Sequence, residues 1–258
     1  MTQIAGVGID AGSTTCKLVA VDAAGNIVAS RLEQAHPRIE VQVEEMLEWL
    51  RSRHGAAKGL PCVATGYGRK LVQCADRQVT EITCHARGVF HDLQRSGTLV
   101  DIGGQDSKVI RIGDDGRPVD FVMNDKCAAG TGRFLEYTAG RLGVDIGDLG
   151  ESVLANGAEE QITSTCTVFA ESEIISLIAH GADIDAILRG LHRSLVGRIV
   201  AMIHSVGWTP PLMLSGGVAL NTAVRMMIGE ALGESVTVPA EPQLTGAYGA
   251  ALLAIEGA

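Results

Sequence analysis

The sequence predicts an α/β protein built from two lobes of similar fold. Of its 258 residues, 46% are hydrophobic but only 3% are aromatic, which is typical of a core packed with alanine, valine, isoleucine and leucine. The 32 glycines predict many tight turns and close backbone approaches. An internal repeat, over residues 7–32 and again over residues 99–122, predicts two lobes, which we place at residues 1–96 and 97–258.

Each copy of the repeat contains the pattern D-x-G-x4-K. The first copy of the pattern runs from Asp10 to Lys17, and the second runs from Asp101 to Lys108. Apolar residues precede each aspartate. A strand-like run, a turn with glycine and aspartate, and a second strand-like run follow each lysine. The repeat therefore predicts the order strand, loop, strand, turn, strand in both lobes.

Both loops have the chemistry of a phosphate site. Glycine lets backbone N–H groups approach phosphate oxygens closely, hydroxyl groups add donors, and lysine adds a point charge unless its side chain is simply exposed. One such loop would be explained as an ordinary hairpin turn, but two loops with equal spacing argue against that explanation. The candidates for nucleotide contact are Asp10, Gly12, Ser13, Thr14, Lys17, Gly103 and Gly104.

Carboxylates in the same region are candidates for metal binding and hydrolysis. Asp10 and Asp101 follow apolar strands, where a carboxylate can hold hydrated Mg²⁺ through water. We predict that Asp101 holds the Mg²⁺-bound water and that Gln105 positions the attacking water. Glu81 is the alternative, although a glutamate that opens a helix is explained equally well by the helix dipole.

A third glycine-rich turn, Ser215-Gly216-Gly217, follows an apolar strand and precedes a helix at about residues 220–231. This context suits the close approach of a nucleotide, although such a turn is a weak signal alone. The chain contains no G-x-x-x-x-G-K-[ST] motif, so it is not a P-loop protein. Further helices are predicted at residues 39–54, 81–94, 128–142, 167–180, 183–206 and 243–256, and further strands at 60–64 and 236–238.

Two of the six cysteines stand out, because Cys127 and Cys166 each come just before a run that is typical of a helix. Two thiolates are half of what a four-cysteine iron–sulfur cluster needs, and a second copy of the chain could supply the other half. The alternative is that both are buried free thiols, which behave as small hydrophobic residues. The other four are interpreted as packing, strand or surface-turn residues: Cys16, Cys62, Cys74 and Cys84.

Charge and hydropathy exclude several classes of partner. The net charge of −9 argues against a nucleic acid or an anionic membrane surface. The N-terminus has no basic segment followed by an apolar signal region, and no stretch approaches the length of a charge-free transmembrane helix. We therefore expect a cytoplasmic protein, where cysteines do not form a disulfide framework.

Taken together, the two D-x-G loops, the Ser-Gly-Gly turn and the Gly/Ala-rich last helix resemble the acetate kinase/sugar kinase/Hsp70/actin superfamily, a duplicated ribonuclease H-like fold. Within it, residues 124–134 and 164–173, which contain the two cysteines, are similar to the BadF/BadG/BcrA/BcrD ATPases. The strongest similarity is to the activators of 2-hydroxyacyl-CoA dehydratases. It extends along the chain and includes Ala64-Thr65-Gly66-Tyr67-Gly68-Arg69 and Cys84-His85-Ala86.

The resemblance implies a homodimer with one [4Fe–4S] cluster, to which each protomer gives Cys127 and Cys166. It implies that ATP or ADP, with Mg²⁺, occupies the cleft between the lobes and also contacts Gly132, Gly216 and Gly217. The cluster segment would be an insertion at about residues 123–206, and the last helix would return to the first lobe. A helix starting at residue 128, capped by Asn124 or Asp125, would stabilise the anionic cluster at its N-terminus.

The same resemblance implies the partners. ATP hydrolysis would drive a low-potential electron into a two-subunit acyl-CoA dehydratase or reductase, with ferredoxin or flavodoxin as the electron donor. Three alternatives stay open at this point. The chain could be an ATPase subunit of a benzoyl-CoA reductase, a small-molecule kinase of the same fold without a cluster, or a nucleotide-dependent assembly protein without enzymatic activity.

Overall fold

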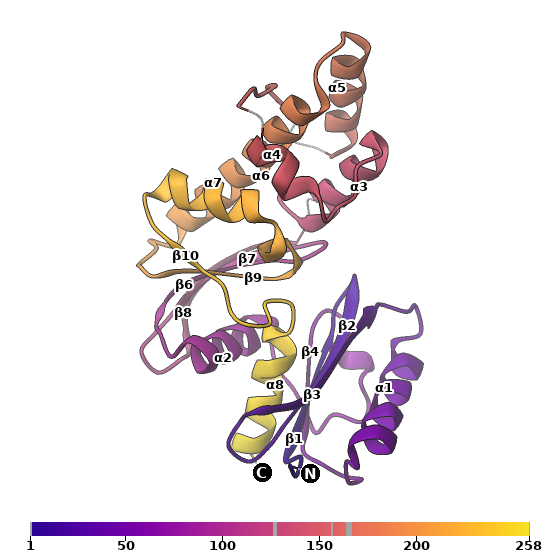
Figure 1. Ribbon diagram of the computed structural model, residues 1–258. Helices are drawn as coiled ribbons and strands as arrows, with labels where there is room; N and C mark the ends of the chain where they lie inside the picture. Colours follow the sequence, from indigo (N-terminus) through magenta and orange to yellow (C-terminus); the bar gives the residue numbers. More distant parts are fainter. Residues whose placement is uncertain (1, 126–127, 156, 164–166, 258) are drawn as a thin grey trace. The chain divides into compact units, whose positions relative to one another are not determined.

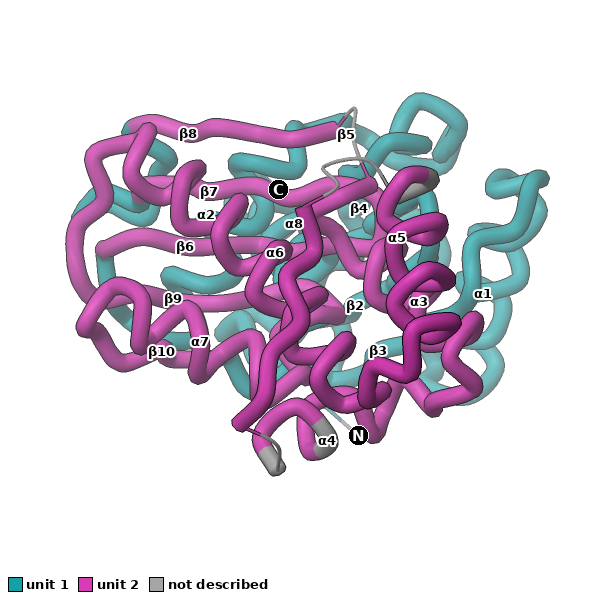
Figure 2. Tube along the Cα trace, turned by 90° about the horizontal axis from the view of Figure 1, so that it is seen from above, with its two compact units in different colours: residues 1–96, 112–119, 239–258 teal, residues 97–111, 120–238 magenta. Residues whose placement is uncertain are grey.

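The structure is a computed structural model that describes residues 2–125, 128–155, 157–163 and 167–257 (Figure 1). The chain forms two compact units, shown in Figure 2. Unit 1 contains Met1–Ser96, Ile112–Val119 and Pro239–Ala258, and unit 2 contains Gly97–Arg111 and Asp120–Val238. Within the described residues, no helix combines the length and the apolar character that crossing a membrane requires.

The sheet of unit 1 has the strand order β3-β2-β1-β4-β5. Strand β1 pairs antiparallel with β2 and parallel with β4. Alternation along β2 divides the core, since Leu18 and Ala20 pack with α1, whereas Val19 and Val21 pack with α8 on the other face. The elements are β1 Gly6–Ala11, β2 Thr15–Val21, β3 Ile27–Gln34, α1 Ile39–His54, β4 Cys62–Thr65, η1 Arg69–Leu71, β5 Arg77–Gln78, α2 Glu81–Leu93 and α8 Thr245–Glu256.

The second sheet has the strand order β10-β9-β6-β7-β8, and β9 is parallel to both β6 and β10. Its core is packed by the apolar faces of α3, α4, α5, α6 and α7. The elements are β6 Gly97–Ile102, β7 Ser107–Ile112, β8 Pro118–Asn124, α3 Gly132–Leu142, α4 Leu149–Ala155, α5 Thr167–Ala179, α6 Ile184–Ser205, β9 Leu212–Ser215, η2 Gly217–Leu220, α7 Thr222–Leu232 and β10 Val236–Thr237.

The predicted duplication is confirmed by the topology. Read from its hairpin edge, the second sheet has the order β8-β7-β6-β9-β10, which repeats β3-β2-β1-β4-β5 strand for strand. In each sheet the D-x-G loop joins the first two strands of the repeat, β1 to β2 and β6 to β7. The two loops therefore occupy equivalent positions in two copies of one fold.

One predicted helix start is wrong. The helix expected from residue 128 begins at Gly132, so neither Asn124 nor Asp125 caps it. Asn124 is the last residue of β8, Gly130 has a φ of +106°, and Thr131 is extended at the N-cap position. A positive φ cannot continue a right-handed helix, and glycine adopts it without strain. Neither α4 nor the exposed two-residue strand β5 was predicted from the sequence.

Glycines set the distance between α2 and α8. A Cβ atom on Gly249 of α8 would lie 1.8 Å from the carbonyl oxygen of Cys84, and one on Gly88 of α2 would lie 2.2 Å from that of Thr245. Both distances are far below van der Waals contact with backbone atoms that cannot move away. Small residues are therefore required where these two helices meet.

Replacing Gly249 with alanine is expected to lower the free energy of unfolding of unit 1 by about 3 kcal/mol, because overpacking forces the backbone apart. Urea unfolding followed by circular dichroism measures this change. The matched control is Gly197→Ala on α6, where a Cβ atom meets nothing within 4 Å. That variant should gain up to about 1 kcal/mol from helix propensity. A similar small gain for Gly249→Ala would contradict the packing argument.

Candidate functional site

The first loop is organised around a partly buried ion pair. Asp10, near the end of β1, is 5% exposed, and it lies opposite Lys17 in the β1–β2 register. Lys17 Nζ lies 2.9 Å from Asp10 Oδ2. A Cβ atom on Gly66 would come within 2.5 Å of Asp10 Oδ1, and one on Gly246 within 3.3 Å of Oδ2. The Asp10 carboxylate is therefore enclosed by the backbone that follows β4 and by the start of α8.

The turn of the same loop leaves a hydroxyl group without a partner. Thr14 Oγ1 is buried, and no described residue forms a hydrogen bond with it. Gly12 has no room for a side chain, since a Cβ atom would lie 2.7 Å from the carbonyl oxygen of Thr15. Ser13 is exposed at the tip. A buried hydroxyl without a partner fits a loop that hydrogen-bonds a ligand oxygen.

Glu81 opens α2 in the same unit and is partly exposed. Its N-cap residue is Thr80, whose hydroxyl accepts a hydrogen bond from Thr83 N at 3.3 Å. Burial raises the pKa of the neighbouring Cys84 thiol to about 12, and the Asp10 and Glu81 carboxylates add to the increase. Asp10 and Glu81 thus raise the pKa of the same thiol. Cys84 is a protonated core residue, and the sequence predicted it as a packing residue.

The second loop holds Asp101 more tightly. Asp101 is 2% exposed, and its Oδ1 accepts a hydrogen bond from Ser215 Oγ at 2.8 Å. Lys108 is equally buried, and its Nζ lies 3.4 Å from Asp101 Oδ2 and 2.7 Å from Asp106 Oδ2. The Lys108 charge is therefore shared by two carboxylates rather than exposed.

Backbone hydrogen bonds join this loop to the start of α3. The amides of Gly132 and Arg133 donate to the carbonyl oxygens of Gly103 and Gly104, each at 2.8 Å. The Ser107 hydroxyl also donates to the carbonyl of Gly130. Both amides therefore already have hydrogen-bond acceptors. They cannot stabilise an anionic cluster at the helix N-terminus, which the sequence had predicted. Because of these bonds, a movement of the second loop would also move the segment before α3.

The amide of Gly103 is used as well, because it donates to the carbonyl oxygen of Asp106 at 2.9 Å. Gln105, at the tip, is exposed. The second loop therefore places Asp101, Gly103, Gly104 and Gly132 together, with Gln105 on its outer side.

Gly216 and Gly217 also belong to this group. Gly216 has a φ of +84°, and a Cβ atom there would lie 2.3 Å from the carbonyl oxygen of Ile102. The turn therefore passes directly over the end of β6, beside Asp101, where only glycine fits. Gly217 begins η2, which leads into α7.

The link that anchors this turn was not predicted from the sequence. His192 of α6 is fully buried, and burial lowers its pKa, so the ring is neutral. Its Nδ1 donates to the carbonyl of Leu188 at 2.8 Å, and its Nε2 accepts from Asn221 Nδ2 at 2.9 Å. Asn221 in turn caps α7 through Val224 N. An asparagine before a helix was the one local signal for this arrangement.

Cys127 and Cys166 lie outside the described residues, but the helices that follow them are joined. The Glu171 carboxylate of α5 accepts a hydrogen bond from the Tyr137 hydroxyl of α3 at 2.7 Å and pairs with Arg141 at 2.7 Å. On α5, Phe169, Ile175 and Ile178 are 69%, 56% and 44% exposed. The two segments therefore lead into neighbouring helices, one of which has an unusually apolar exposed face.

Metal ligands are sparse in the part of the chain that the structure describes. Within residues 2–125, 128–155, 157–163 and 167–257, no group of three or more histidine, cysteine or acidic side chains could hold a metal ion. Asp10 and Asp101 are each buried beside a lysine. Single carboxylates of this kind suit a Mg²⁺ ion that keeps its water ligands.

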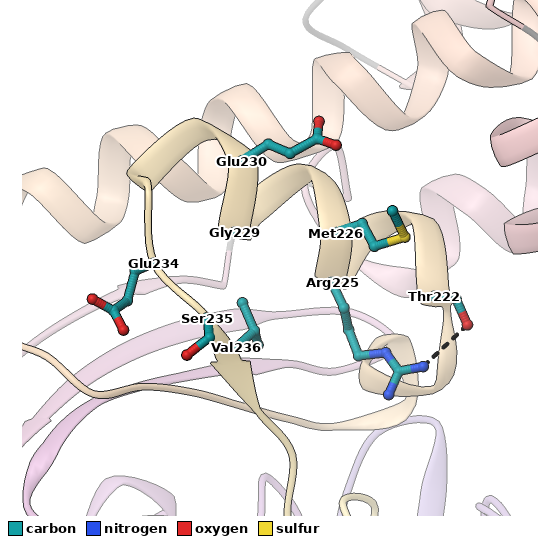
Figure 3. Close-up of a pocket in the computed structure, with 8 residues that line it drawn as sticks. All are labelled: Thr222, Arg225, Met226, Gly229, Glu230, Glu234, Ser235 and Val236. Carbon is teal, nitrogen blue, oxygen red and sulfur yellow. Dashed lines mark hydrogen bonds between the residues drawn. The ribbon is translucent and has the colours of Figure 1, made fainter.

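A hollow of about 390 Å³ lies along α7 and β10 (Figure 3). Arg225 and Thr222 form its polar end, where Arg225 Nη2 donates to Thr222 Oγ1 at 3.0 Å. None of the predicted site residues lines it. The full lining is Thr222, Arg225, Met226, Gly229, Glu230, Glu234, Ser235 and Val236.

Known proteins are similar over almost the entire chain. The model of the BadF/BadG/BcrA/BcrD ATPase family matches residues 7–254. The 2-hydroxyisocaproyl-CoA dehydratase activator of Clostridioides difficile is 41% identical, with 98% of this chain and 95% of the relative covered. The (R)-2-hydroxyglutaryl-CoA dehydratase activating ATPase of Acidaminococcus fermentans is 40% identical, with 98% and 97% covered.

Solved structures agree. The activator of the 2-hydroxyisocaproyl-CoA dehydratase from Clostridium difficile, with bound ADPNP, matches with a TM-score of 0.91 and 40% identity, covering 98% of this chain and 94% of that one. The ethanolamine utilization protein EutJ from Carboxydothermus hydrogenoformans, 20% identical over 96% and 89% of the two chains, shares the fold with a TM-score of 0.61. The predicted two-lobed fold of the acetate kinase/sugar kinase/Hsp70/actin superfamily is confirmed.

A more distant relative bears on the alternatives. One component of the benzoyl-CoA reductase of Thauera aromatica is 30% identical, with 98% of this chain and 93% of the relative covered. The chain is therefore more similar to the two dehydratase activators than to this reductase component.

Proposed function

The chain belongs to the BadF/BadG/BcrA/BcrD ATPase family, and from that premise we propose that it is an ATP-hydrolysing iron–sulfur activator of a two-subunit acyl-CoA dehydratase. The observation that carries this proposal is the similarity to two dehydratase activators, 40% and 41% identical with at least 95% of each relative covered. This chain contains both D-x-G loops and both cysteine segments on which the resemblance rests.

Both loops would contact the nucleotide or its Mg²⁺ ion. On unit 1, the buried Thr14 hydroxyl and the Lys17 charge are suited to phosphate oxygens. On unit 2, Asp101 would hold Mg²⁺ through water, and the exposed Gln105 would orient the attacking water. The alternative for the second role is Glu81, which belongs to unit 1. Phosphoryl transfer depends on such positioning and on electrostatic stabilisation more than on covalent chemistry by the protein. The ADPNP bound to the similar activator supports a nucleotide site.

The thiolates of Cys127 and Cys166, two from each of two copies, would hold a [4Fe–4S] cluster. Four cysteines are the ligand set of such a cluster, which supplies low-potential one-electron chemistry when bound. Of the other four cysteines, Cys16 and Cys84 are buried with pKa values raised to about 12, mainly by burial, Cys62 is buried as well, and Cys74 is exposed in unit 1. The apolar exposed face of α5 supports an interface between two copies at this end of the unit.

Contacts within the chain suggest how nucleotide binding would affect the segment that follows Cys127. The loop that carries Asp101 is bonded through Gly103 and Gly104 to the first amides of α3. A shift of the loop on nucleotide binding would therefore move the segment that follows Cys127. Reciprocal linkage then requires that the state of that segment alter nucleotide affinity in turn.

Ferredoxin or flavodoxin would deliver the electron, and the dehydratase would receive it. The benzoyl-CoA reductase alternative is less well supported, because that relative is 30% identical, whereas the two activators are 40% and 41% identical. A sugar kinase without a cluster would leave the two cysteine segments without a role.

Anaerobically purified protein, given a reduced donor and ATP–Mg²⁺, is expected to activate a resting two-subunit 2-hydroxyacyl-CoA dehydratase. ADP–Mg²⁺ in place of ATP–Mg²⁺ is the control and should give no activation, because no hydrolysis drives the electron. The measurement is the rate of 2-enoyl-CoA formation. Activity with benzoyl-CoA reductase subunits alone would favour the alternative, and phosphorylation of a sugar by a colourless protein would refute the proposal.

A further inference from the structure

His85 of α2 is a buried residue of unit 1 to which the proposed function gives no role. It is 7% exposed, and its ring reaches the start of α8. The Nδ1 atom lies 2.9 Å from the hydroxyl oxygen of Thr245, the first residue of α8, and Thr245 is itself 3% exposed. One nitrogen of the ring is therefore held by a buried hydroxyl group, which fixes the orientation of the ring.

The other nitrogen of the ring faces the Asp10 carboxylate. A Cβ atom on Gly246, the second residue of α8, would lie 3.1 Å from His85 Nε2 and 3.3 Å from Asp10 Oδ2. Both atoms thus border the small space that a glycine leaves open at the start of α8. Asp10 Oδ2 is also the atom that pairs with Lys17 Nζ, at 2.9 Å. His85 Nε2 therefore lies beside the ion pair of the first loop.

Two contacts determine which nitrogen of the ring carries the hydrogen. In an uncharged imidazole, one nitrogen donates and the other accepts. The Thr245 hydroxyl can donate to His85 Nδ1 at 2.9 Å or to the carbonyl oxygen of Pro242 at 3.5 Å, and the shorter contact is the stronger one. A hydroxyl that donates to Nδ1 requires the hydrogen on Nε2. The Asp10 carboxylate favours the same tautomer, because an ionised carboxylate can only accept.

We propose that His85 is a positioning residue for ATP hydrolysis, whose ring is fixed by Thr245 and whose Nε2–H group keeps the Asp10 carboxylate oriented for the nucleotide and its Mg²⁺ ion. The Lys17 ammonium is a point charge that does not by itself fix the plane of a carboxylate. A second donor from another direction does. This role rests on the proposed function, because it assigns His85 to the nucleotide site proposed above.

Two variants separate the two nitrogens, since the amide of asparagine can replace Nδ1 and the amide of glutamine can replace Nε2. His85→Asn keeps a partner for the Thr245 hydroxyl and removes the donor beside Asp10. It is expected to lower kcat for ATP hydrolysis about 10- to 100-fold, which is typical for the loss of a group that orients a ligand. KM for ATP–Mg²⁺ should change less than about threefold. His85→Gln keeps a donor beside Asp10 and should retain kcat within about threefold of wild type.

His91→Asn is the matched control, because His91 also lies on α2 and contacts a hydroxyl group of α8. Its Nδ1 lies 2.7 Å from the Tyr248 hydroxyl oxygen. Its Nε2 lies beside the turn between β2 and β3, since a Cβ atom on Gly25 would come within 3.0 Å of it. Urea unfolding should therefore show a loss of stability in His91→Asn, while kcat stays within about threefold of wild type. The proposal is overturned if His85→Asn hydrolyses ATP at the wild-type rate, if His91→Asn is slowed as much, or if His85→Gln is slowed as much.

The tautomer of His85 gives a readout that does not depend on hydrolysis. Long-range ¹H–¹⁵N spectra of the wild-type protein labelled with ¹⁵N-histidine distinguish hydrogen on Nε2 from hydrogen on Nδ1. The signals of His85, assigned by their loss in His85→Gln, should show hydrogen on Nε2. Hydrogen on Nδ1 would overturn the proposal even if His85→Asn does not fold. A wild-type protein that hydrolyses no ATP would contradict the proposed function and this role with it, whereas normal hydrolysis in all variants would overturn only the role of His85.

Discussion

Cys127→Ser and Cys166→Ser are each expected to reduce bound iron from about four atoms per dimer to near zero, because each change removes two of the four thiolate ligands from a shared cluster. The brown colour should be lost with the iron. The dimer should dissociate more readily, since metal–ligand bonds that join two chains contribute directly to their association. Iron and sulfide analysis, the visible spectrum and analytical ultracentrifugation measure the three effects.

Cys74→Ser is the matched control for these variants. Cys74 is exposed and lies in unit 1, so its replacement should leave iron content and dimerisation unchanged. Circular dichroism verifies that all three variants keep their helix content. Full iron in either Cys127→Ser or Cys166→Ser would remove that cysteine from the proposed ligand set, and equal iron loss in Cys74→Ser would point to a nonspecific effect of oxidation.

The duplicated fold could be predicted because its signal is local and occurs twice. The pattern from Asp10 to Lys17 recurs from Asp101 to Lys108, and each copy lies between two strands of its sheet. Turn glycines, strand alternation and an aspartate at the end of a strand are all determined by neighbouring residues. The helices at residues 39–54 and 183–206 were found for the same reason, within one residue of their observed ends.

Features that depend on distant residues were missed or misplaced. The start of α3 was placed four residues early, because its position is determined by Gly130 in a positive-φ conformation and by bonds from Gly132 and Arg133 to a loop 29 residues earlier. The bond between Asn221 and His192, also 29 residues apart, has no sequence signature beyond the asparagine that caps α7.

The candidate site shows the same division. Residue types at the two loops indicated phosphate chemistry, but they did not reveal that Lys108 is shared between Asp101 and Asp106 or that the Gly103 amide is already bonded to Asp106. These contacts matter for function, because a loop whose polar groups pair internally has to rearrange or recruit Mg²⁺ to meet a phosphate. That rearrangement would involve Asp101, because Asp101 pairs with Lys108.

Asp101→Asn is expected to slow ATP hydrolysis by about 10²–10³-fold, which is the effect of removing one preorganised electrostatic group from the site of phosphoryl transfer. The asparagine keeps the shape of the side chain and can still accept the hydrogen bond that Ser215 Oγ donates at 2.8 Å. Nucleotide affinity should fall by less than about tenfold, because most phosphate contacts come from other groups. Phosphate release and titration with a fluorescent ATP analogue measure the two quantities separately.

Asp106→Asn is the matched control, because it removes the other carboxylate beside Lys108, at 2.7 Å, and leaves Asp101 in place. If Asp101 acts through Mg²⁺, hydrolysis in Asp106→Asn should fall by less than about tenfold, and raising Mg²⁺ should partly restore only the Asp101→Asn enzyme. If the two carboxylates merely neutralise buried Lys108, both variants should lose hydrolysis and stability alike. Unchanged turnover in Asp101→Asn would move the metal role to Asp10, whose carboxylate is paired with Lys17 in the equivalent position of the first loop.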